Sequence, residues 1–363
     1  MADQITNYQC PNCLGGLRFD GASGQQACDS CGTKFDVGVI EQLYADKEQA
    51  AASAGTEPQW DITMTNNFSA EEAALMRGYR CPSCAAAIIC DHTTAATSCP
   101  YCGNPTVVPG QFSDELRPDY VIPFKYEKAA AIEALKKYYK GKRLLPKSFA
   151  DANHLEEIKG IYVPFWLYDG ETEAAMRFHG TRVHTHMSGN YRITDTDHYR
   201  VTREGYVAFQ NVPVDASSKM PDAHMDSIEP FNYGDLKPFS TAYLPGFLAD
   251  KYDEDAEKCS KRANERIIAS TERVFMDTAS GYTTLRREYS NINLRRGGIK
   301  YALMPVWLLT TKWKEKSFLF AMNGQTGKLI GDLPVDKGRL IGWLFKLAAP
   351  IAAVLVAAYL LFF

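Results

Sequence analysis

Residues 79–109 read YRCPSCAAAIICDHTTAATSCPYCGNPTVVP, and residues 8–37 read YQCPNCLGGLRFDGASGQQACDSCGTKFDV. Each stretch holds two Cys-x-x-Cys pairs with 14 residues between them. Two pairs at this separation can place four thiolates at the corners of a tetrahedron, the geometry of a structural zinc ion with all-cysteine ligation. The spacing therefore predicts two zinc ribbons and two structural Zn ions, with the ligands Cys10, Cys13, Cys28 and Cys31 in the first and Cys81, Cys84, Cys99 and Cys102 in the second.

The residues between the pairs predict the rest of each ribbon. LRFD and QQA flank a GASG turn in the first, and AAAIICD and AATS flank HTT in the second, so each ribbon should contain a β-hairpin. Gly32 and Gly103 follow their pairs and permit a tight turn, whereas Leu14 and Ala85 take the equivalent places after the other pairs. Four thiolates leave no open coordination position, so neither ion should be catalytic. Tetrahedral sulfur also suits iron, so the spacing alone leaves zinc and iron open.

Cysteine usage also bears on the compartment. Eight of the ten cysteines fall in these pairs, and the N-terminal MADQITNYQC lacks the basic-then-apolar pattern of a signal peptide. We therefore expect a reducing cytoplasm, in which such cysteines bind metal rather than form disulfides. Cys90 and His92 form a C-x-H pair, but the apolar neighbours of Cys90 favour a small buried side chain.

The C-terminal stretch LAAPIAAVLVAAYLLFF, residues 347–363, contains no charged residue. Its 17 residues would span about 26 Å as a helix, and the apolar residues before Lys346 extend it beyond the roughly 30 Å of a hydrocarbon core. Lys337 and Arg339 precede the segment, and no basic residue follows it. The positive-inside rule therefore predicts a single-pass anchor with the N-terminal body in the cytoplasm.

The large middle part of the chain carries an internal duplication. EEIKGIYVPFWLYD at 156–169 and RGGIKYALMPVWLLTT at 296–311 share Lys, an apolar strand and Pro-x-Trp-Leu. A strand-like piece and an amphipathic helix precede each copy, and alternating pieces that turn at Gly and Asn follow it. This pattern predicts an α+β body of two related halves, each a helix packed on an antiparallel sheet.

These features divide the chain into five parts. We expect zinc ribbon 1 at 1–40, a linker with short helices at 41–78, zinc ribbon 2 at 79–112, the duplicated α+β cytoplasmic body at 113–336 and the transmembrane anchor at 337–363.

Other chemistry-bearing residues favour structural roles. His179, His184, His186 and His198 cluster in the sequence, but no cysteine or closely spaced carboxylate completes a metal site. We therefore expect these histidines to be polar residues on the solvent-exposed face of an antiparallel sheet. Trp166 and Trp307 stand at matched positions of the two halves, which favours core anchors, and their strand prolines suggest a sheet edge or bulge. The sequence contains no recognised catalytic motif, so we expect a protein without enzymatic activity.

The stretch CPSCAAAIICDHTTAATSCPYCGNPTVVPG resembles bacterial TFIIB-type zinc ribbon-containing membrane proteins of the YdjG-like kind. The resemblance continues through YVIPF, GIYVPFWLYD, YLPGFLADKYD and ALMPVWLL to the anchor, and so covers most of the chain. It implies a non-enzymatic protein of the bacterial cell membrane that helps to recruit an SPFH (flotillin-like) protein and, through it, PspA-type envelope-stress machinery.

Three functions therefore compete. The first is a membrane-anchored adaptor that binds protein partners. The second is a nucleic-acid-binding protein of replication or transcription, which the charge disfavours because the first ribbon carries two basic residues and the second carries one. The third is a membrane-associated enzyme of unknown chemistry, for which the histidines from His179 to His198 are the one candidate region.

Overall fold

A computed structural model describes residues 10–11, 17–21, 23–40, 42, 60–61, 67–94, 96, 98–105, 107–110, 116–147, 149, 155–314 and 316–362. Cys13, Leu14 and most of the expected linker at 41–78 lie outside the described residues. The chain divides into two compact units, Met1–Gln59 and Trp60–Phe363.

The first unit contains a small antiparallel sheet. Strands β1 (Leu17–Asp20) and β2 (Gln25–Cys28) form the predicted hairpin, and β3 (Lys34–Phe35) pairs with β2. The turn closes through a backbone hydrogen bond of 2.8 Å from Gly24 N to Asp20 O, with Gly24 at a φ of +65°. The hairpin predicted between the first two cysteine pairs is therefore confirmed.

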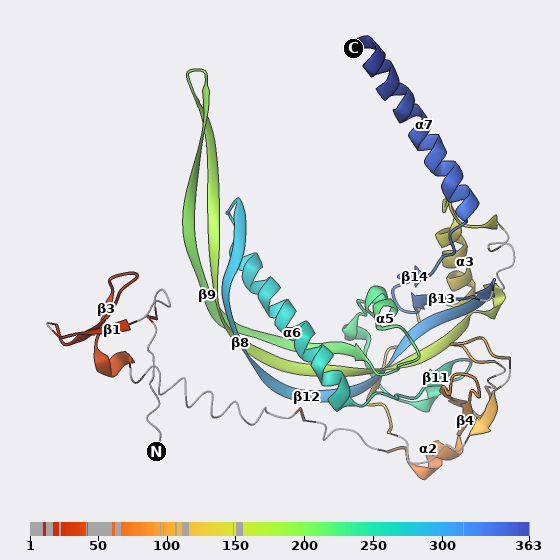
Figure 1. Cartoon of the computed structure of the whole chain (residues 1–363). Helices are drawn as coiled ribbons and strands as arrows, with labels where there is room; N and C mark the ends of the chain where they lie inside the picture. The colour runs from red at the N-terminus through yellow and green to blue at the C-terminus, as the bar shows by residue number, and fades with distance from the viewer. Residues whose placement is uncertain are drawn as a thin grey trace. The chain divides into compact units, whose positions relative to one another are not determined.

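The second unit is built on one mixed sheet of 11 strands (Figure 1). Its strands are β4 (Met76–Arg80), β5 (Ala87–Asp91), β6 (Val108–Gly110), β7 (Tyr120–Val121), β8 (Lys159–Ser188), β9 (Tyr191–Asp215), β10 (Lys237–Pro238), β11 (Leu248–Asp250), β12 (Thr284–Trp313), β13 (Lys316–Asn323) and β14 (Leu329–Gly331). Its helices are α2 (Ala70–Ala74), α3 (Lys128–Tyr139), α5 (Asp222–Ile228), α6 (Ala256–Thr278) and α7 (Lys337–Phe362), with 3-10 turns η1 (Leu155–Glu157), η2 (Tyr233–Asp235) and η3 (Thr241–Tyr243).

The two Pro-x-Trp repeats lie side by side at the centre of this sheet. Pro164 of β8 pairs with Leu303 of β12, and Pro305 of β12 pairs with Tyr162 of β8. Residues 162 and 164 stand 141 positions before residues 303 and 305, so the antiparallel pairing maps each repeat onto the other. A local two-fold axis therefore relates the repeats. The expectation of a separate sheet in each half was wrong, because the two apolar strands pair with each other.

The same symmetry places the prolines where a missing N–H is tolerated. Pro164 O accepts a hydrogen bond of 2.9 Å from Ala216 N, and Pro305 O accepts one of 2.8 Å from Gly324 N. The nitrogen of an extended residue faces the same side as its carbonyl, so each proline nitrogen faces away from the β8–β12 ladder. The prolines thus lie in central strands, not at the edge or bulge suggested by their residue type.

Helices α3 and α6 cover the same face of the sheet. Trp307 and Leu309 pack against α3, and Trp166 and Tyr301 pack against α6. The Trp166 indole donates to Glu254 O and the Trp307 indole to Tyr126 O, each over 2.9 Å and each just before the helix that its ring supports. The prediction that both tryptophans are core anchors is confirmed.

Strands β8 and β9 are longer than the alternation of residues suggests. Strand β8 continues through Gly180, and a β-carbon there would lie 2.7 Å from the Tyr282 ring. The chain turns at residues 189–190 instead, and beyond Thr181 no third strand among the described residues joins the β8–β9 ladder. Gly180 therefore makes room for an aromatic ring rather than for a turn.

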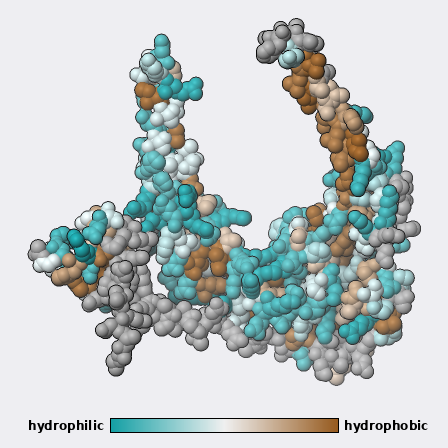
Figure 2. All heavy atoms as spheres, in the orientation of Figure 1, coloured by the Kyte–Doolittle hydropathy of each residue, from teal (hydrophilic) through white to brown (hydrophobic). Residues whose placement is uncertain are grey.

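Helix α7 is long and apolar enough to cross a membrane, and among the described residues it is the one helix that meets this criterion. The candidate span covers Lys337–Val356. Several large apolar side chains of this span, such as Ile351 and Leu355, are exposed. Figure 2 shows a hydrophobic surface along α7. A helix that leaves such residues uncovered in water needs another apolar environment.

Candidate metal centre

The second cysteine group brings four thiols together. Cys81 Sγ lies 3.6 Å from Cys102 Sγ, and Cys84 Sγ lies 3.6 Å from Cys99 Sγ. All four sulfur atoms lie within 4.8 Å of one another. A tetrahedral ion with metal–sulfur bonds of ~2.3 Å separates its ligands by about 3.8 Å, whereas a disulfide requires ~2.05 Å. The spacing of the thiols therefore fits metal ligands, and this group could hold a metal ion.

Two short turns position these thiols. Ala85 N donates to Cys81 O over 2.9 Å, and Gly103 N donates to Cys99 O over 3.1 Å. Both turn residues have left-handed backbone, with φ of 56° at Ala85 and 67° at Gly103. Glycine adopts this conformation freely, whereas alanine does so at a cost. The turn at Ala85 is therefore less favourable than the turn at Gly103, because its backbone is strained.

The electrostatics of the group differ between thiols. Burial acts to raise the pKa of Cys81, but hydrogen bonds from the backbone of Cys84 and Ser83 and from the Cys102 thiol outweigh it, and the pKa is lowered to about 7. Burial raises the pKa of Cys84 and of Cys99. A bound cation would stabilise the thiolate form of all four and release their protons.

The second group is seated on the main sheet. Strand β5, which follows Cys84, pairs with both β4 and β11. The Thr310 hydroxyl of β12 donates to Pro100 O over 3.0 Å and to Tyr101 O over 2.8 Å, which fixes the second turn. Instead of the expected AATS strand, β4 and β11 supply the partners of β5, and the described residues of AATS, 96 and 98, are not in a strand.

A lysine lies beside this group. Lys159 Nζ donates to Ser98 O over 2.7 Å and also to the Ser98 hydroxyl. Burial lowers the pKa of Lys159, while the nearby Cys99 raises it. Four thiolates around a divalent ion carry a formal charge of −2, so the Lys159 ammonium would stabilise the occupied site.

The first group shows the same local pattern in its described part. Cys10, Cys28 and Cys31 offer sulfur atoms within 4.8 Å of one another, and Cys10 Sγ lies 3.6 Å from Cys31 Sγ. Gly32 N donates to Cys28 O over 2.9 Å, as Gly103 N does to Cys99 O. The fourth predicted ligand, Cys13, lies outside the described residues. This group too could hold a metal ion.

The two remaining cysteines are not ligands in either group. Cys90 is fully buried, and its thiol donates to Thr94 O over 3.0 Å. Cys259 of α6 is 1% exposed, and its thiol lies 3.7 Å from Asp215 O. The prediction that Cys90 is a small buried side chain is confirmed.

Four histidines lie on the β8–β9 hairpin, two beside each other and two beside aspartates. His179 Nε2 lies 2.9 Å from His198 Nδ1. His184 and His186 are exposed and lie within 3.8 Å and 3.3 Å of the carboxylates of Asp197 and Asp195. Among the described residues, every group that could hold a metal consists of cysteines alone. The histidines therefore belong to the solvated surface of the hairpin.

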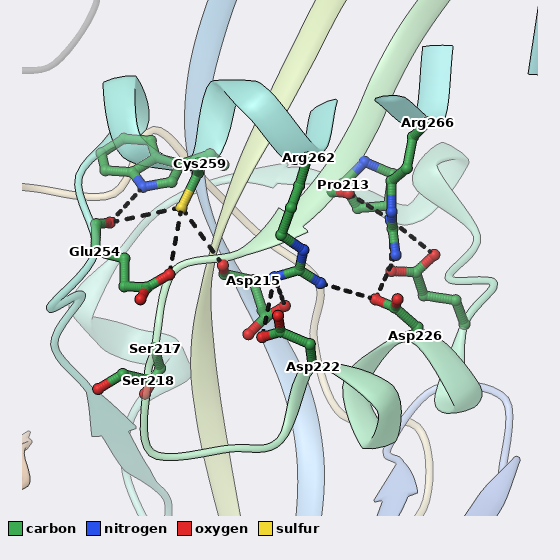
Figure 3. A network of polar contacts seen from close by, with 12 residues as sticks. Pro213, Asp215, Ser217, Ser218, Asp222, Asp226, Glu254, Cys259, Arg262 and Arg266 are labelled. Atoms are coloured by element: carbon green, nitrogen blue, oxygen red, sulfur yellow. Dashed lines mark hydrogen bonds and ion pairs between the residues drawn. The ribbon is translucent and has the colours of Figure 1, made fainter. Parts of the chain in front are cut away.

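A network of ion pairs joins α6 to the end of β9 and to α5 (Figure 3). Arg262 Nη1 lies 2.9 Å from Asp215 Oδ1, and Arg266 pairs with Asp226 and Glu229. Burial raises the pKa of Asp215 to about 6, although Arg262 opposes the shift. Removing one partner of such a buried pair leaves an uncompensated charge, so these residues hold α6 in place.

Comparison with known proteins finds a relative that matches nearly the whole chain. The chain is 36% identical over 344 residues to a protein of Bacillus subtilis (strain 168) named "Uncharacterized protein YdjG", and the match covers 95% of this chain and 94% of that protein. No family model matches the chain. No solved structure matches it either. The similarity along nearly the whole of both sequences shows that the chain belongs to the family of Bacillus subtilis YdjG.

Proposed function

We propose that this protein is a membrane-anchored zinc-ribbon adaptor, which binds protein partners at the cytoplasmic face of a bacterial cell membrane. The observation that carries the proposal is the combination, in one chain, of two all-cysteine groups with an apolar helix at the C-terminal end. The cysteine groups are closed structural sites, and the apolar helix is an anchor. This pairing suits a scaffold held at a membrane.

We assign zinc to both cysteine groups. The sulfur atoms of Cys81 and Cys102 and of Cys84 and Cys99 are spaced as zinc-bound thiolates require. A bound zinc ion supplies no redox chemistry, and with four protein ligands it has no position for substrate. Its contribution is therefore folding free energy for the short turns that form each group.

The basic residues at the start of α7 support a cytoplasmic body. Arg339 Nη1 donates to Leu145 O over 2.8 Å, and the Arg143 guanidinium lies 4.9 Å from the centre of the Trp343 ring. Arginine and tryptophan at this end of the apolar helix are typical of a membrane interface, and basic residues favour the cytoplasmic side. The resemblance to zinc-ribbon membrane proteins suggests that the partners are an SPFH (flotillin-like) protein and PspA-type machinery.

Charge favours protein partners over nucleic acid. The two basic residues of the first ribbon lie near carboxylates, Arg18 at 3.8 Å from Asp29 and Lys34 at 2.7 Å from Asp20. Nucleic-acid binding draws most of its affinity from several free lysine or arginine contacts to phosphates. A salt-sensitive shift of DNA or RNA by the purified protein at physiological salt would favour the nucleic-acid reading instead.

The test removes residues 340–363 in cells that carry a tagged copy. We expect the truncated protein to move to the soluble fraction and its crosslinked partners to disperse from the membrane. The matched control replaces residues 340–363 with an unrelated transmembrane helix of the same length, which should restore the membrane location of both. Partners that remain at the membrane after truncation would refute the adaptor role.

A further inference from the structure

A cavity of about 420 Å³ lies beside the second cysteine group, within the second unit. It is lined by the loop before Cys99, the first residues of α3 and β8, the turn before β11 and one tryptophan of β12: Thr94, Ala96, Glu127, Lys128, Ile158, Lys159, Gly160, Gly246, Phe247, Leu248 and Trp307. This volume is within the range of small-molecule sites, about 300–1,000 Å³. The cavity is separate from the thiols themselves, none of which lines it.

The lining combines positive charge with an aromatic wall. Two ammonium groups, Lys128 and Lys159, line the cavity with one carboxylate, Glu127. Burial has the largest effect and lowers the pKa of Lys159, the nearby Cys99 and Glu157 raise it, and Lys128 lowers it. Trp307 and Phe247 supply the apolar surface. An anion joined to an apolar group matches both halves of this lining.

The internal duplication shows that Lys159 and its counterpart have different neighbours. Its counterpart 141 positions later, Lys300, lies 2.6 Å from the Asp169 carboxylate. The residue that matches Asp169 in the other half is Thr310, which instead donates to backbone oxygens of the second cysteine group. The half that contains Lys300 thus has a lysine paired with Asp169, while the matching position beside Lys159 holds a threonine, and the nearby Glu157 and Cys99 raise the pKa of Lys159.

We propose that this cavity binds a small organic anion, a carboxylate or phosphate carried on an aromatic or similarly flat apolar body. Lys128 and Lys159 hold the anionic group, and Trp307 and Phe247 contact the apolar part. The proposal does not depend on the adaptor role, and it shares with the second cysteine group only Lys159, which also contacts Ser98.

Isothermal titration calorimetry on the full chain in phosphatidylcholine nanodiscs tests this site. The probes are phenyl phosphate, benzoate, inorganic phosphate and benzyl alcohol. We expect phenyl phosphate or benzoate to bind at least tenfold more tightly than inorganic phosphate and benzyl alcohol, because only the first two satisfy both the ammonium groups and the aromatic wall. The preference between phenyl phosphate and benzoate identifies the anionic group.

Two pairs of variants locate the binding. K128Q should weaken binding about two- to fivefold, as expected for an exposed charge, while K136Q on the last turn of α3 should not change it. K159Q should weaken binding about tenfold or more, while K300Q at the matched position of the other half should not. Thermal melting checks that each variant is folded. Absence of binding by both aromatic anions, or equal binding by K128Q, K136Q, K159Q and K300Q, would overturn the proposal.

Discussion

Replacing Ala85 by glycine should strengthen metal binding by the second cysteine group. Ala85 has a φ of 56° in the turn that follows Cys84. Left-handed backbone costs a residue other than glycine about 1–2 kcal/mol, and glycine returns about 0.4–1 kcal/mol of this through the greater freedom of the unfolded chain. The net gain is about 0.5–1 kcal/mol. Because the turn folds together with the metal, this gain should appear as a two- to fivefold lower zinc Kd.

Replacing a glycine by alanine in the other turn of this group should weaken its zinc binding. Gly103 has a φ of 67°, and a β-carbon there would make only an ordinary contact, 3.8 Å from Thr310 O. Gly103→Ala should therefore weaken zinc binding by a similar factor through backbone strain alone. Gly189 at the hairpin tip has a φ of 61° and no atom within 4 Å of an added β-carbon. Gly189→Ala imposes the same strain far from the thiols and should leave the zinc Kd unchanged.

Competition with a chromophoric chelator measures these affinities on the purified full chain. Zinc is titrated against the chelator for the parent, A85G, G103A and G189A proteins, and the equivalents bound are counted by mass spectrometry. The reasoning is refuted if A85G binds zinc no more tightly than the parent, or if G189A alters the affinity as much as G103A does.

Three further changes test other parts of the structure. Cys81→Ser should remove one equivalent of metal and lower the melting temperature of the second unit, whereas Cys10→Ser should remove one equivalent without that effect; metal analysis and melting curves show the difference. Burial raises the pKa of Asp250 to about 7 from an ordinary 3.8, so the folded state holds this proton more tightly than the unfolded state does. Its stabilising contribution is complete below about pH 4 and is lost as the pH rises to about 7. Asp250→Asn should therefore flatten the pH dependence of the free energy of unfolding between these limits, and an unchanged slope in denaturant titrations would contradict this. Trp166→Phe and Trp307→Phe each remove one indole hydrogen bond to a backbone oxygen and should each lower the free energy of unfolding by about 1–3 kcal/mol. A similar loss in the two variants is expected from the symmetry, and a loss in one alone would argue against equivalent anchors.

Several parts of this protein could be predicted because they depend on local sequence. The Cys-x-x-Cys pairs bring their thiols together through short turns, so the spacing alone predicts both groups of ligands. Helices α3, α6 and α7 follow from apolar periodicity and from the uncharged C-terminal stretch. The two Pro-x-Trp repeats were visible as matched residues in the linear sequence. In each case the interacting residues are near neighbours or share a simple pattern.

Other features depend on contacts between distant residues, which no local pattern contains. Whether two apolar strands build separate sheets or pair with each other is decided by packing, and here the repeats pair about a local two-fold axis. Strand β8 runs through Gly180, where the ring of the distant Tyr282 occupies the space of the absent side chain. The partners of β5 come from β4 and β11 rather than from the adjacent AATS.

The sequence by itself determined the cysteine groups, the helices, the duplication and the apolar C-terminal segment, because each is encoded by the types and spacing of nearby residues. Only the tertiary structure decided that the second cysteine group rests on the main sheet, and that the two halves share that sheet. It also decided that Lys159 lines a cavity, whereas its counterpart Lys300 pairs with Asp169. These outcomes depend on which distant surfaces pack together, and burial and charge acquire their effects only after that packing.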